Sequence, residues 1–289
     1  MVFHIDVGNL DHGDSTQTKY DHRPFHLPTL KAATSKWQKF IEGNDGWTTS
    51  FLENHDNGRC VSRYASDEPQ YREASAKMLA MMEVSMTGTI FVYQGQEIGS
   101  INAPKSWPIE EYKDVEAKNY YEEARKHSEE NPGQVPSRLE IVRNGLQILG
   151  RDHSRLPMQW DSTANAGFST GKPWMRVHDL YPEINVEKQS GDPASVLSFW
   201  KKMLRLRKEH ADVFVYGVFD IVDAKNESTF MFTKTSAEKK AFVALNFSKI
   251  IQLIEFPQIS GQWELAVWNY EKRKDGALEA FEGRVYLSN

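Results

Sequence analysis

The sequence predicts a chain that begins as an α/β structure and ends as an all-β structure. Over residues 1–100, short apolar runs alternate with stretches of helical periodicity, which is the pattern of βα units around a parallel sheet. After about His210 the pattern changes to short apolar runs separated by turn residues, which is typical of a small antiparallel sandwich. We therefore predict residues 1–210, with an irregular insert at about 101–190, as one part and residues 211–289 as another.

The first part contains three candidate strands and two helices. The strands are expected at Val2–Asp6, Thr48–Leu52 and Thr89–Tyr93. Apolar residues at helical spacing predict helices over Leu30–Glu42 and Tyr71–Thr87, with Gly88 as the C-terminal stop of the second.

The insert and the second part follow other patterns. The charged stretch Glu110–Glu130 predicts a solvated helix, and Leu139–Leu149 predicts another short helix. Asp192 followed by Pro193 indicates a helix start, and that helix is expected to bury Val196, Phe199, Trp200, Met203 and Leu204 on one face. The later strands are expected at Val213–Val222, Thr229–Thr235, Ala241–Phe247, Gln252–Phe256, Trp263–Trp268 and Arg284–Leu287.

The composition restricts the class of protein. Hydrophobic residues make up 39% and charged residues 26%, which is ordinary for a globular protein, and the net charge of −5 is interspersed. We therefore expect neither a nucleic-acid nor a membrane partner. The single Cys60 excludes an internal disulfide and agrees with a cytoplasmic protein. No histidine pair or Cys-His cluster has metal-ligand spacing, so we expect no metal and no cofactor.

The tetrad Glu53-Asn54-His55-Asp56 is the most informative motif. It places a carboxylate beside an imidazole where a predicted strand gives way to a loop, which is where catalytic carboxylates of βα barrels lie. This placement indicates sugar chemistry. Taken alone, a loop aspartate more often caps the following turn, and a lone histidine is more often structural.

Four motifs resemble one family in the correct order. Residues 51–56 resemble the fourth signature of the α-amylase superfamily, glycoside hydrolase family 13, and residues 89–99 are similar to its last barrel strand and loop. Residues 151–160 resemble the motif of the α-glucosidase and oligo-1,6-glucosidase branch, and residues 166–169 with 172–174 continue it. Fungal maltases and isomaltases look most similar. The resemblance implies a partial (β/α)8 TIM barrel, about its last three βα units, followed by an antiparallel β-sandwich.

The resemblance also implies roles for four residues. Asp56 matches the family's transition-state stabiliser, and His55 matches a histidine that donates to the same sugar. Arg151 matches an arginine near that sugar, the alternative being an ion pair that holds the loop. Glu116 matches an acid on the aglycone side, the alternative being a surface helix glutamate.

Three positions depart from the family pattern. Leu156 replaces a small hydroxyl residue, which puts the local hydrogen bonding in doubt. Asn57-Gly58 stand where the family commonly has Gln after the Asp, so linkage preference is open, and Gly58 is expected to loosen the loop.

The resemblance covers only the second half of such an enzyme. Residues 1–6 resemble the sixth barrel strand, so the family's nucleophilic Asp and acid/base Glu would precede Met1, and neither Asp6 nor Asp11 lies in a motif to replace them. We expect a retaining α-glucosidase lineage acting on maltose-, isomaltose- or sucrose-type oligosaccharides, inactive alone, with a missing N-terminal half as partner. The alternative is a non-catalytic sugar- or partner-binding pseudoenzyme. Three βα units cannot close a barrel, so we expect exposed apolar edges and poor solubility or dependence on a partner.

Overall fold

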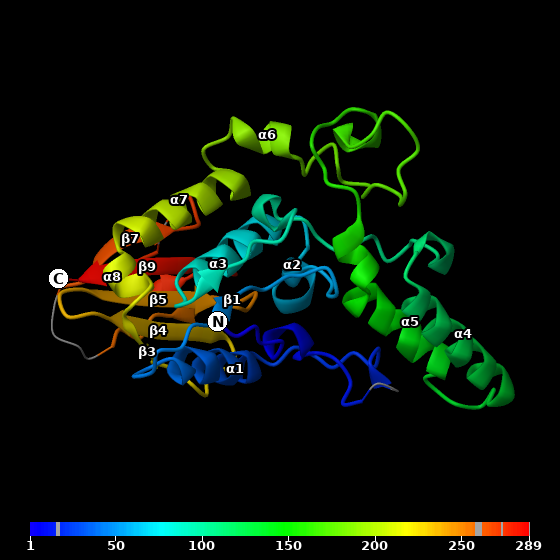
Figure 1. Cartoon of the computed structure of the whole chain (residues 1–289), viewed down its shortest axis with the longest axis horizontal. Helices are drawn as coiled ribbons and strands as arrows, with labels where there is room; N and C mark the ends of the chain where they lie inside the picture. Colours follow the sequence, from blue (N-terminus) through cyan, green and yellow to red (C-terminus); the bar gives the residue numbers. More distant parts are fainter. Residues whose placement is uncertain (16–17, 258–261, 273, 289) are drawn as a thin grey trace.

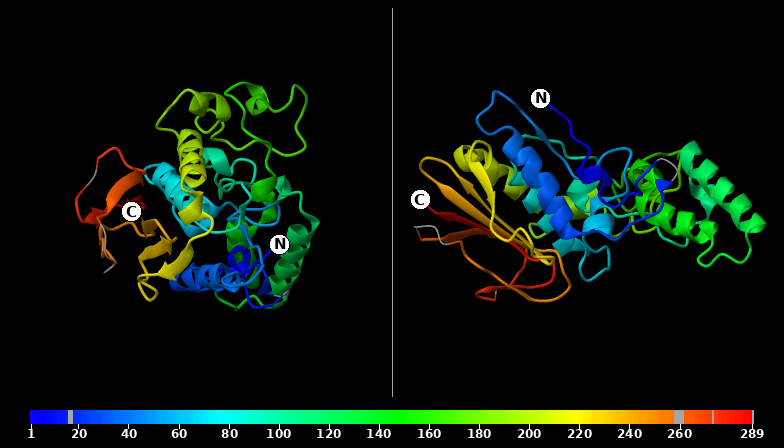
Figure 2. Two further views of the ribbon diagram at one scale, coloured as in Figure 1. Left: turned by 60° about the vertical axis from the view of Figure 1, so that its left-hand side comes forward. Right: turned by 90° about the horizontal axis from the view of Figure 1, so that it is seen from below.

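The computed structural model describes residues 1–15, 18–257, 262–272 and 274–288. An antiparallel sheet lies at one end of the molecule, with α1 (Leu27–Phe40), α3 (Arg72–Val84) and α7 (Val196–Glu209) beside it (Figure 1). At the opposite end α4 (Val115–Glu130) and α5 (Arg138–Leu149) form an antiparallel pair, and the view from below shows the same separation (Figure 2). Short helices α2 (Cys60–Tyr64), α6 (Val186–Ser190) and α8 (Ala211–Phe214) complete the helical part.

The N-terminal part contains a small parallel sheet. β1 (Thr49–Ser50) pairs in parallel with β2 (Thr89–Ile90), and Val2 adds one parallel bridge to Thr48. The parallel arrangement therefore agrees with the prediction, but the strands are shorter than predicted. The backbone N–H of Phe91 still donates to Ser50 O at 3.0 Å, and beyond this bond the chain leaves the ladder, since no pairing is described for residues 3–6, 51–52 or 92–93.

The two helices predicted in this part form with bounds close to the prediction. α1 starts three residues before the predicted Leu30 because Pro28 occupies its first turn, where the missing N–H costs no helical hydrogen bond. α3 ends at Val84 with Ser85 as its C-cap, so the prediction of Gly88 as the stop was wrong. Gly88 has a φ of +123°, and a Cβ there would lie 2.9 Å from Thr48 O. Gly88 is thus required by the close approach to the neighbouring strand rather than by the helix.

The charged stretch of the insert is helical, as predicted, from Val115 onward. The Asp114 side chain accepts from the N–H of Ala117 and caps α4, and Ala117 and Ala124 are its buried residues. α5 begins with a capping box, in which Ser137 and Glu140 each bind the other's backbone N–H. These caps stabilise the N-terminal ends of both helices.

The start and the buried face of α7 differ from the prediction. Its N-cap is Ser195, whose hydroxyl accepts from the N–H of Ser198 at 3.1 Å, whereas Asp192 and Pro193 lie in the preceding turn. Leu204 is 42% exposed, so it was wrongly assigned to the buried face. The buried apolar residues follow strict helical spacing and stop one residue earlier: Val196, Phe199, Trp200 and Met203.

A five-stranded antiparallel sheet forms the C-terminal end. Its order is β3 (Val218–Ile221), β4 (Thr229–Thr235), β5 (Lys240–Asn246), β9 (Gly283–Ser288) and β7 (Glu264–Trp268). β6 (Gln252–Leu253) and β8 (Ala277–Leu278) form a separate antiparallel pair. The prediction of one strand over Val213–Val222 was wrong, because Val213 and Phe214 belong to α8. A short buried apolar run looks the same in a helix and in a strand.

One hydrophobic core joins the sheet to the helices. Met78 and Met82 of α3, Trp200 of α7, and Phe230 and Phe232 of β4 belong to the same buried cluster. The other face of the sheet carries a second cluster that includes Phe242, Leu278 and Tyr286. The sheet therefore supports α1, α3 and α8 directly (Figure 1).

Large apolar side chains are exposed along the parallel strands. Phe3 is 57%, Ile5 63% and Phe91 39% exposed, and the rings of Phe3 and Phe91 lie 4.8 Å apart. The same region exposes Met1, Val2 and Val92. Such a contiguous apolar edge is typical of a surface that another polypeptide covers. Of the helices described, none is both long and apolar enough to span a bilayer.

Lys234 of β4 is buried against the segment that follows α3. Its side chain is fully inaccessible, and its Nζ donates to the hydroxyl of Thr87. Burial, reinforced by the nearby Arg207, lowers the pKa of Lys234 to about 7, against a weaker opposing effect of Glu42. A charged lysine at this interface is therefore destabilising.

This lysine predicts a pH-dependent stability. Because its pKa is lower in the folded than in the unfolded state, the unfolded state binds more protons between about pH 7 and pH 10. The free energy of unfolding of the native chain should therefore rise with pH across this window, by roughly 2–4 kcal/mol relative to Lys234→Met. Urea denaturation at pH 6.5 and 9.5 measures the difference. Lys201→Met, at an exposed position of α7, is the control, and identical pH slopes for the native chain and Lys234→Met would contradict the assignment.

Candidate active site

The tetrad lies on the loop between β1 and α2. Asn54 forms the turn here, since its Oδ1 accepts the backbone N–H of Asp56 at 2.8 Å. Asp56 therefore does not act as the turn cap, and its side chain is 52% exposed. The carboxylate is left available for other groups.

Three nitrogen-bearing side chains surround the carboxylate of Asp56. Arg155 Nη2 lies 2.9 Å and Arg151 Nη1 3.5 Å from Oδ1, and His55 Nε2 lies 3.3 Å from Oδ2. Arg155 also donates its Nε to the backbone oxygen of His55 at 2.8 Å. One guanidinium thus fixes both His55 and Asp56. The sequence prediction missed Arg155, although its place four residues after Arg151 in the same motif was an available signal.

Arg151 connects the tetrad to the start of α4. Its Nη2 lies 2.5 Å from Asp114 Oδ1 and 3.8 Å from Glu116 Oε2. Burial alone would raise the pKa of Asp114, but the hydrogen bonds from Arg151 and from the backbone of Ala117 outweigh it and lower that pKa. The hydrogen bond with Asp114 in turn raises the pKa of Arg151. Arg151 therefore makes the loop-holding ion pair and also faces Asp56.

The two residues that follow Arg151 are structural. Asp152 accepts the backbone N–H groups of Lys113 at 2.6 Å and Asp114 at 3.0 Å. His153 is fully buried, and burial lowers its pKa to about 4. Its Nδ1 accepts from the N–H of Ala103, which leaves the proton on Nε2, facing Leu146 O at 3.0 Å.

A pocket of about 540 Å³ brings the predicted residues together. Asp56, Arg151 and Glu116 line it, with His12 and Lys19 from the segment after the first predicted strand. His55 touches Asp56 but does not line the pocket. Lys19 Nζ pairs with Glu116 at 2.6 Å, and nothing in the sequence pattern indicated either Lys19 or His12.

His12 enters this pocket as a neutral group. Burial, with the nearby charge of Arg63, lowers its pKa to about 4. Its ring can therefore donate or accept a hydrogen bond at neutral pH without carrying charge.

Glu53, the first residue of the tetrad, forms a buried ion pair with Arg59. Glu53 Oε2 lies 2.8 Å from Arg59 Nη1, and Glu53 Oε1 accepts the backbone N–H of Cys60 at 2.8 Å. The same Nη1 donates to Gln94 O at 2.8 Å. Glu53 and Arg59 are 3% and 4% exposed. They connect the loops that follow both strands, which fixes where the tetrad lies.

The two aspartates near the first predicted strand are engaged elsewhere. Asp11 is fully buried and forms an ion pair with Arg63. Asp6 pairs with Lys36 at 2.8 Å and accepts from the Trp37 indole at 2.8 Å. Neither lines the pocket around Asp56.

The three residues that depart from the family pattern, Asn57, Gly58 and Leu156, each make or allow a specific contact. Asn57 donates its side-chain amide to Gly8 O at 3.0 Å, and Leu156 packs with Ala103, Trp107 and Met175. The structure gives Gly58 a further role, because a Cβ there would lie 2.2 Å from Ile148 O. Glycine is needed for the loop to pass close to the end of α5.

Among the described residues, no three His, Cys, Asp or Glu side chains lie close enough together to hold a metal ion. The candidate site therefore consists of carboxylate, guanidinium and imidazole groups. Such a set can hydrogen-bond a hydroxylated ligand and stabilise positive charge that develops on it.

Comparisons with known proteins agree with this fold. The description "Alpha amylase, catalytic domain" matches residues 1–217, so the chain belongs to the α-amylase family. It is similar to an α-glucosidase of Candida albicans, with 41% identity over 99% of this chain and 50% of that protein. It is also similar to an oligo-1,6-glucosidase of Saccharomyces cerevisiae, with 40% identity over 98% of this chain and 49% of that protein.

Solved structures show the same relationship. Isomaltulose synthase from Klebsiella sp. LX3 superposes with a TM-score of 0.89 at 31% identity, covering 99% of this chain and 50% of that one. Trehalose-6-phosphate hydrolase of Bacillus licheniformis superposes with a TM-score of 0.89 at 32% identity, covering 100% and 51%. The chain thus spans about half the length of the relatives that it matches.

Removing one member of the Glu53–Arg59 pair should destabilise the chain strongly. Glu53→Gln leaves a buried guanidinium without its counter-charge, which typically costs about 3–5 kcal/mol. The double variant Glu53→Gln/Arg59→Met should recover part of the loss, since no buried charge remains. Denaturant unfolding measures both. Lys19→Gln, which breaks the partly exposed pair with Glu116, is the control and should cost less than about 1 kcal/mol. A loss for Glu53→Gln as small as for the control would contradict the structural role.

Proposed function

We propose that this chain supplies the sugar-stabilising part of a retaining α-glucosidase. The observation that supports it best is the pocket that is lined by Glu116 and by Asp56, whose carboxylate is held by Arg151 and Arg155. Relatives that match nearly the whole chain are named α-glucosidase and oligo-1,6-glucosidase. The proposed substrates are therefore α-glucosides of the maltose, isomaltose or sucrose type.

The proposed roles follow from the charge that develops during glycoside cleavage. As the glycosidic bond breaks, the sugar ring becomes positive, and the carboxylate of Asp56 stabilises this state more than the ground state. His55 and Arg151 donate hydrogen bonds to the hydroxyls of the same sugar. Glu116, at the pocket wall, accepts from the leaving sugar.

The nucleophile and the proton donor are proposed to lie in a preceding half of the enzyme. Retaining hydrolysis needs two carboxyl groups about 5–5.5 Å apart, of which one must attack and the other protonate. Asp56 is held by two guanidinium groups, and Glu116 pairs with Lys19 and Arg151. Asp6 and Asp11 are engaged outside the pocket. We therefore propose that the chain alone does not hydrolyse glycosides.

The same proposal accounts for the exposed parallel edge. We infer that the Val2 segment, β1 and β2 belong to about the last three βα units of an eight-stranded barrel. Residues 1–210, with the insert at 101–190, would form this catalytic part, and residues 211–289 a β-sandwich domain. The exposed side chains of Phe3, Ile5 and Phe91 support an edge that the remaining strands cover. We propose the cytoplasm as the compartment of this protein. The single cysteine, Cys60, is buried and forms no disulfide, which agrees with a reducing compartment.

Complementation tests the proposal directly. The chain is co-expressed with the N-terminal half of the Candida albicans α-glucosidase, and hydrolysis of maltose, isomaltose and p-nitrophenyl α-glucoside is measured. Recovered hydrolysis, absent from either half alone, is the expected result. Sequencing the transcript upstream of Met1 shows whether the natural half is encoded there in frame. Two folded halves that associate without hydrolysis would contradict the proposal.

A non-catalytic sugar-binding protein of the same lineage is the second candidate. The buried packing of Leu156 against Trp107 and Met175, in place of the family's small hydroxyl residue, favours it. This candidate predicts that the chain binds α-glucosides and that no complementing half restores hydrolysis.

Asp56→Asn should abolish most of the recovered activity. The amide keeps the shape of the side chain but loses the charge that stabilises the positive sugar ring, so kcat should fall by roughly 10²–10³. Steady-state kinetics on the complemented enzyme measure this effect. Asp45→Asn, in an exposed turn, is the control with the same chemical change. A loss of less than about tenfold would show that Asp56 is not the stabilising group.

A further inference from the structure

A pocket of about 420 Å³ lies between α3, α7 and the end of β7. It shares no lining residue with the pocket around Asp56. Lys77 of α3 lines it, together with residues of α7 and of the turn before that helix, and Trp268 is the last residue of β7. The two helices pack against each other (Figure 1). We call this cavity the α7 pocket.

The α7 pocket carries an excess of positive charge. Lys77, Lys202 and Arg205 line it, whereas Glu271 is the single acid among its lining residues. The chain as a whole has a net charge of −5, so this excess is local and opposite in sign to the rest of the molecule. A hollow lined by one sign of charge attracts ligands of the other sign.

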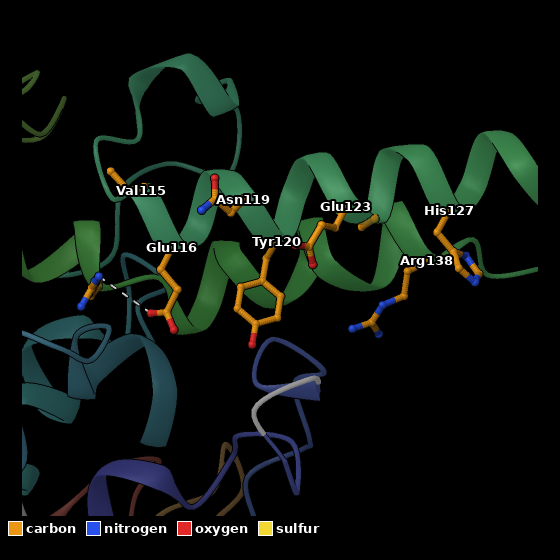
Figure 3. A pocket seen from close by; sticks show the side chains of 9 residues that line it. Val115, Glu116, Asn119, Tyr120, Glu123, His127 and Arg138 are labelled. Atoms are coloured by element: carbon orange, nitrogen blue, oxygen red, sulfur yellow. Dashed lines mark ion pairs between the residues drawn. The ribbon is translucent and has the colours of Figure 1, made fainter.

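The larger groove along α4 does not have this excess. Figure 3 shows Glu116, Glu123 and Arg138 at this groove of about 780 Å³, and Arg151 also lines it. Two acids thus face two bases, and Arg151 and Glu116 lie 3.8 Å apart. The imbalance of the α7 pocket is therefore not a general property of the hollows of this protein.

The two cations of α7 are not neutralised by carboxylates. Among the residues that the structure describes, neither Lys202 nor Arg205 forms an ion pair. Lys202 Nζ lies 5.7 Å from the centroid of the Trp268 ring, a cation–π contact that holds the ammonium group at the pocket wall. Positions 198, 202 and 205 lie on one helical face and extend over about 10 Å. Such spacing suits a ligand with several negative groups.

Lys77 is a buried cation with incomplete compensation. It is 9% exposed, and its Nζ donates to the backbone oxygen of Ala194, at the turn before α7. Glu73 Oε2 lies 3.7 Å from this Nζ. Burial lowers the pKa of Lys77, and the carboxylates of Glu73 and Asp192 offset the effect only in part. A bound anion would provide further counter-charge.

The uncharged polar groups of the pocket are already engaged by the protein. The hydroxyls of Ser198 and Tyr270 donate to backbone oxygens at 2.7 and 2.6 Å. The side-chain amide of Asn269 donates to two backbone oxygens, at 2.8 and 2.9 Å, and accepts a backbone N–H at 2.8 Å. A neutral sugar would have to compete for these groups. An anion can bind the three cations without doing so.

An aromatic wall adds an apolar surface beside the cations. Phe199, Trp268 and Tyr270 contribute rings to the lining. Trp268 and Tyr270 are half-buried, so part of each ring is accessible. Rings of this kind stack with flat heterocycles. The lining therefore suits a ligand that joins a flat ring to several negative charges.

We propose that the α7 pocket binds a nucleoside di- or triphosphate. The phosphate chain would lie against Lys77, Lys202 and Arg205, and the base against the aromatic wall. This inference does not depend on the function proposed for the Asp56 pocket. A bound nucleotide would connect α3, α7 and β7 and would stabilise the folded chain.

Calorimetric titration of the 289-residue chain, in buffer without divalent cations, tests the proposal. ATP and ADP are compared with adenosine and with tripolyphosphate. ATP should bind at least about tenfold more tightly than adenosine, which lacks the charged groups. It should bind at least about fivefold more tightly than tripolyphosphate, which lacks the base. No binding of ATP and ADP, or equal affinities of ATP and either of the other two ligands, would overturn the proposal.

Variants of α7 locate the site. Lys202→Gln/Arg205→Gln should weaken ATP binding about tenfold or more, because two charge-assisted contacts are lost. Lys201→Gln/Lys208→Gln makes the same change of charge on the same helix, at exposed positions outside the pocket, and is the matched control. Circular dichroism verifies that both variants are folded. Unchanged binding in folded Lys202→Gln/Arg205→Gln, or an equal loss in the control, would overturn the proposal.

Discussion

The buried Glu53–Arg59 ion pair is the constraint on which the position of the site depends. The loops that follow two neighbouring parallel strands carry polar groups, and loops of this kind have few contacts of their own to hold them. The pair binds the first loop to the start of α2 through the N–H of Cys60 and to the second loop through Gln94 O. Because both charges are inaccessible to water, a change that leaves either one buried without its partner carries a large energetic cost.

The support beneath these loops comes from distant parts of the chain. α3 packs on one side against α7 and on the other against strands of the C-terminal sheet, and all of them share one buried cluster. The C-terminal sheet therefore contributes to the packed core that holds α3, next to the loops of the site, in position. The α4–α5 pair, in contrast, reaches the site mainly through polar contacts of Arg151, Asp114 and Asp152.

Segments whose apolar and turn residues fit only a helix or only a strand were predictable from the sequence. Segments whose residues fit both were not. The strand at Thr229–Thr235 and the helix at Leu139–Leu149 follow from clear periodicity and turn residues, and the structure has both within one residue. Val213 and Phe214 were assigned to a strand because a buried helical turn has the same apolar residues. Only two residues of β1 pair with two residues of β2. The length of this ladder depends on how the two segments pair in the folded chain, and the sequence of one segment alone does not determine it.

The site was predictable to a similar extent. Asp56, Arg151 and Glu116 were selected on motif resemblance, and the fold places them around one pocket although they are far apart in the sequence. Arg155 was missed because its role depends on reaching Asp56 across a loop-to-loop contact. Lys19 and His12 carry no local pattern, so only the folded chain shows that they face the same pocket.

The close approach at Gly58 has an evolutionary consequence. Because any side chain there would collide with the backbone of Ile148, at the end of α5, position 58 is closed to substitution unless the whole helix pair moves. Because the two segments must change together, a substitution at position 58 would require a compensating change at the end of α5 first.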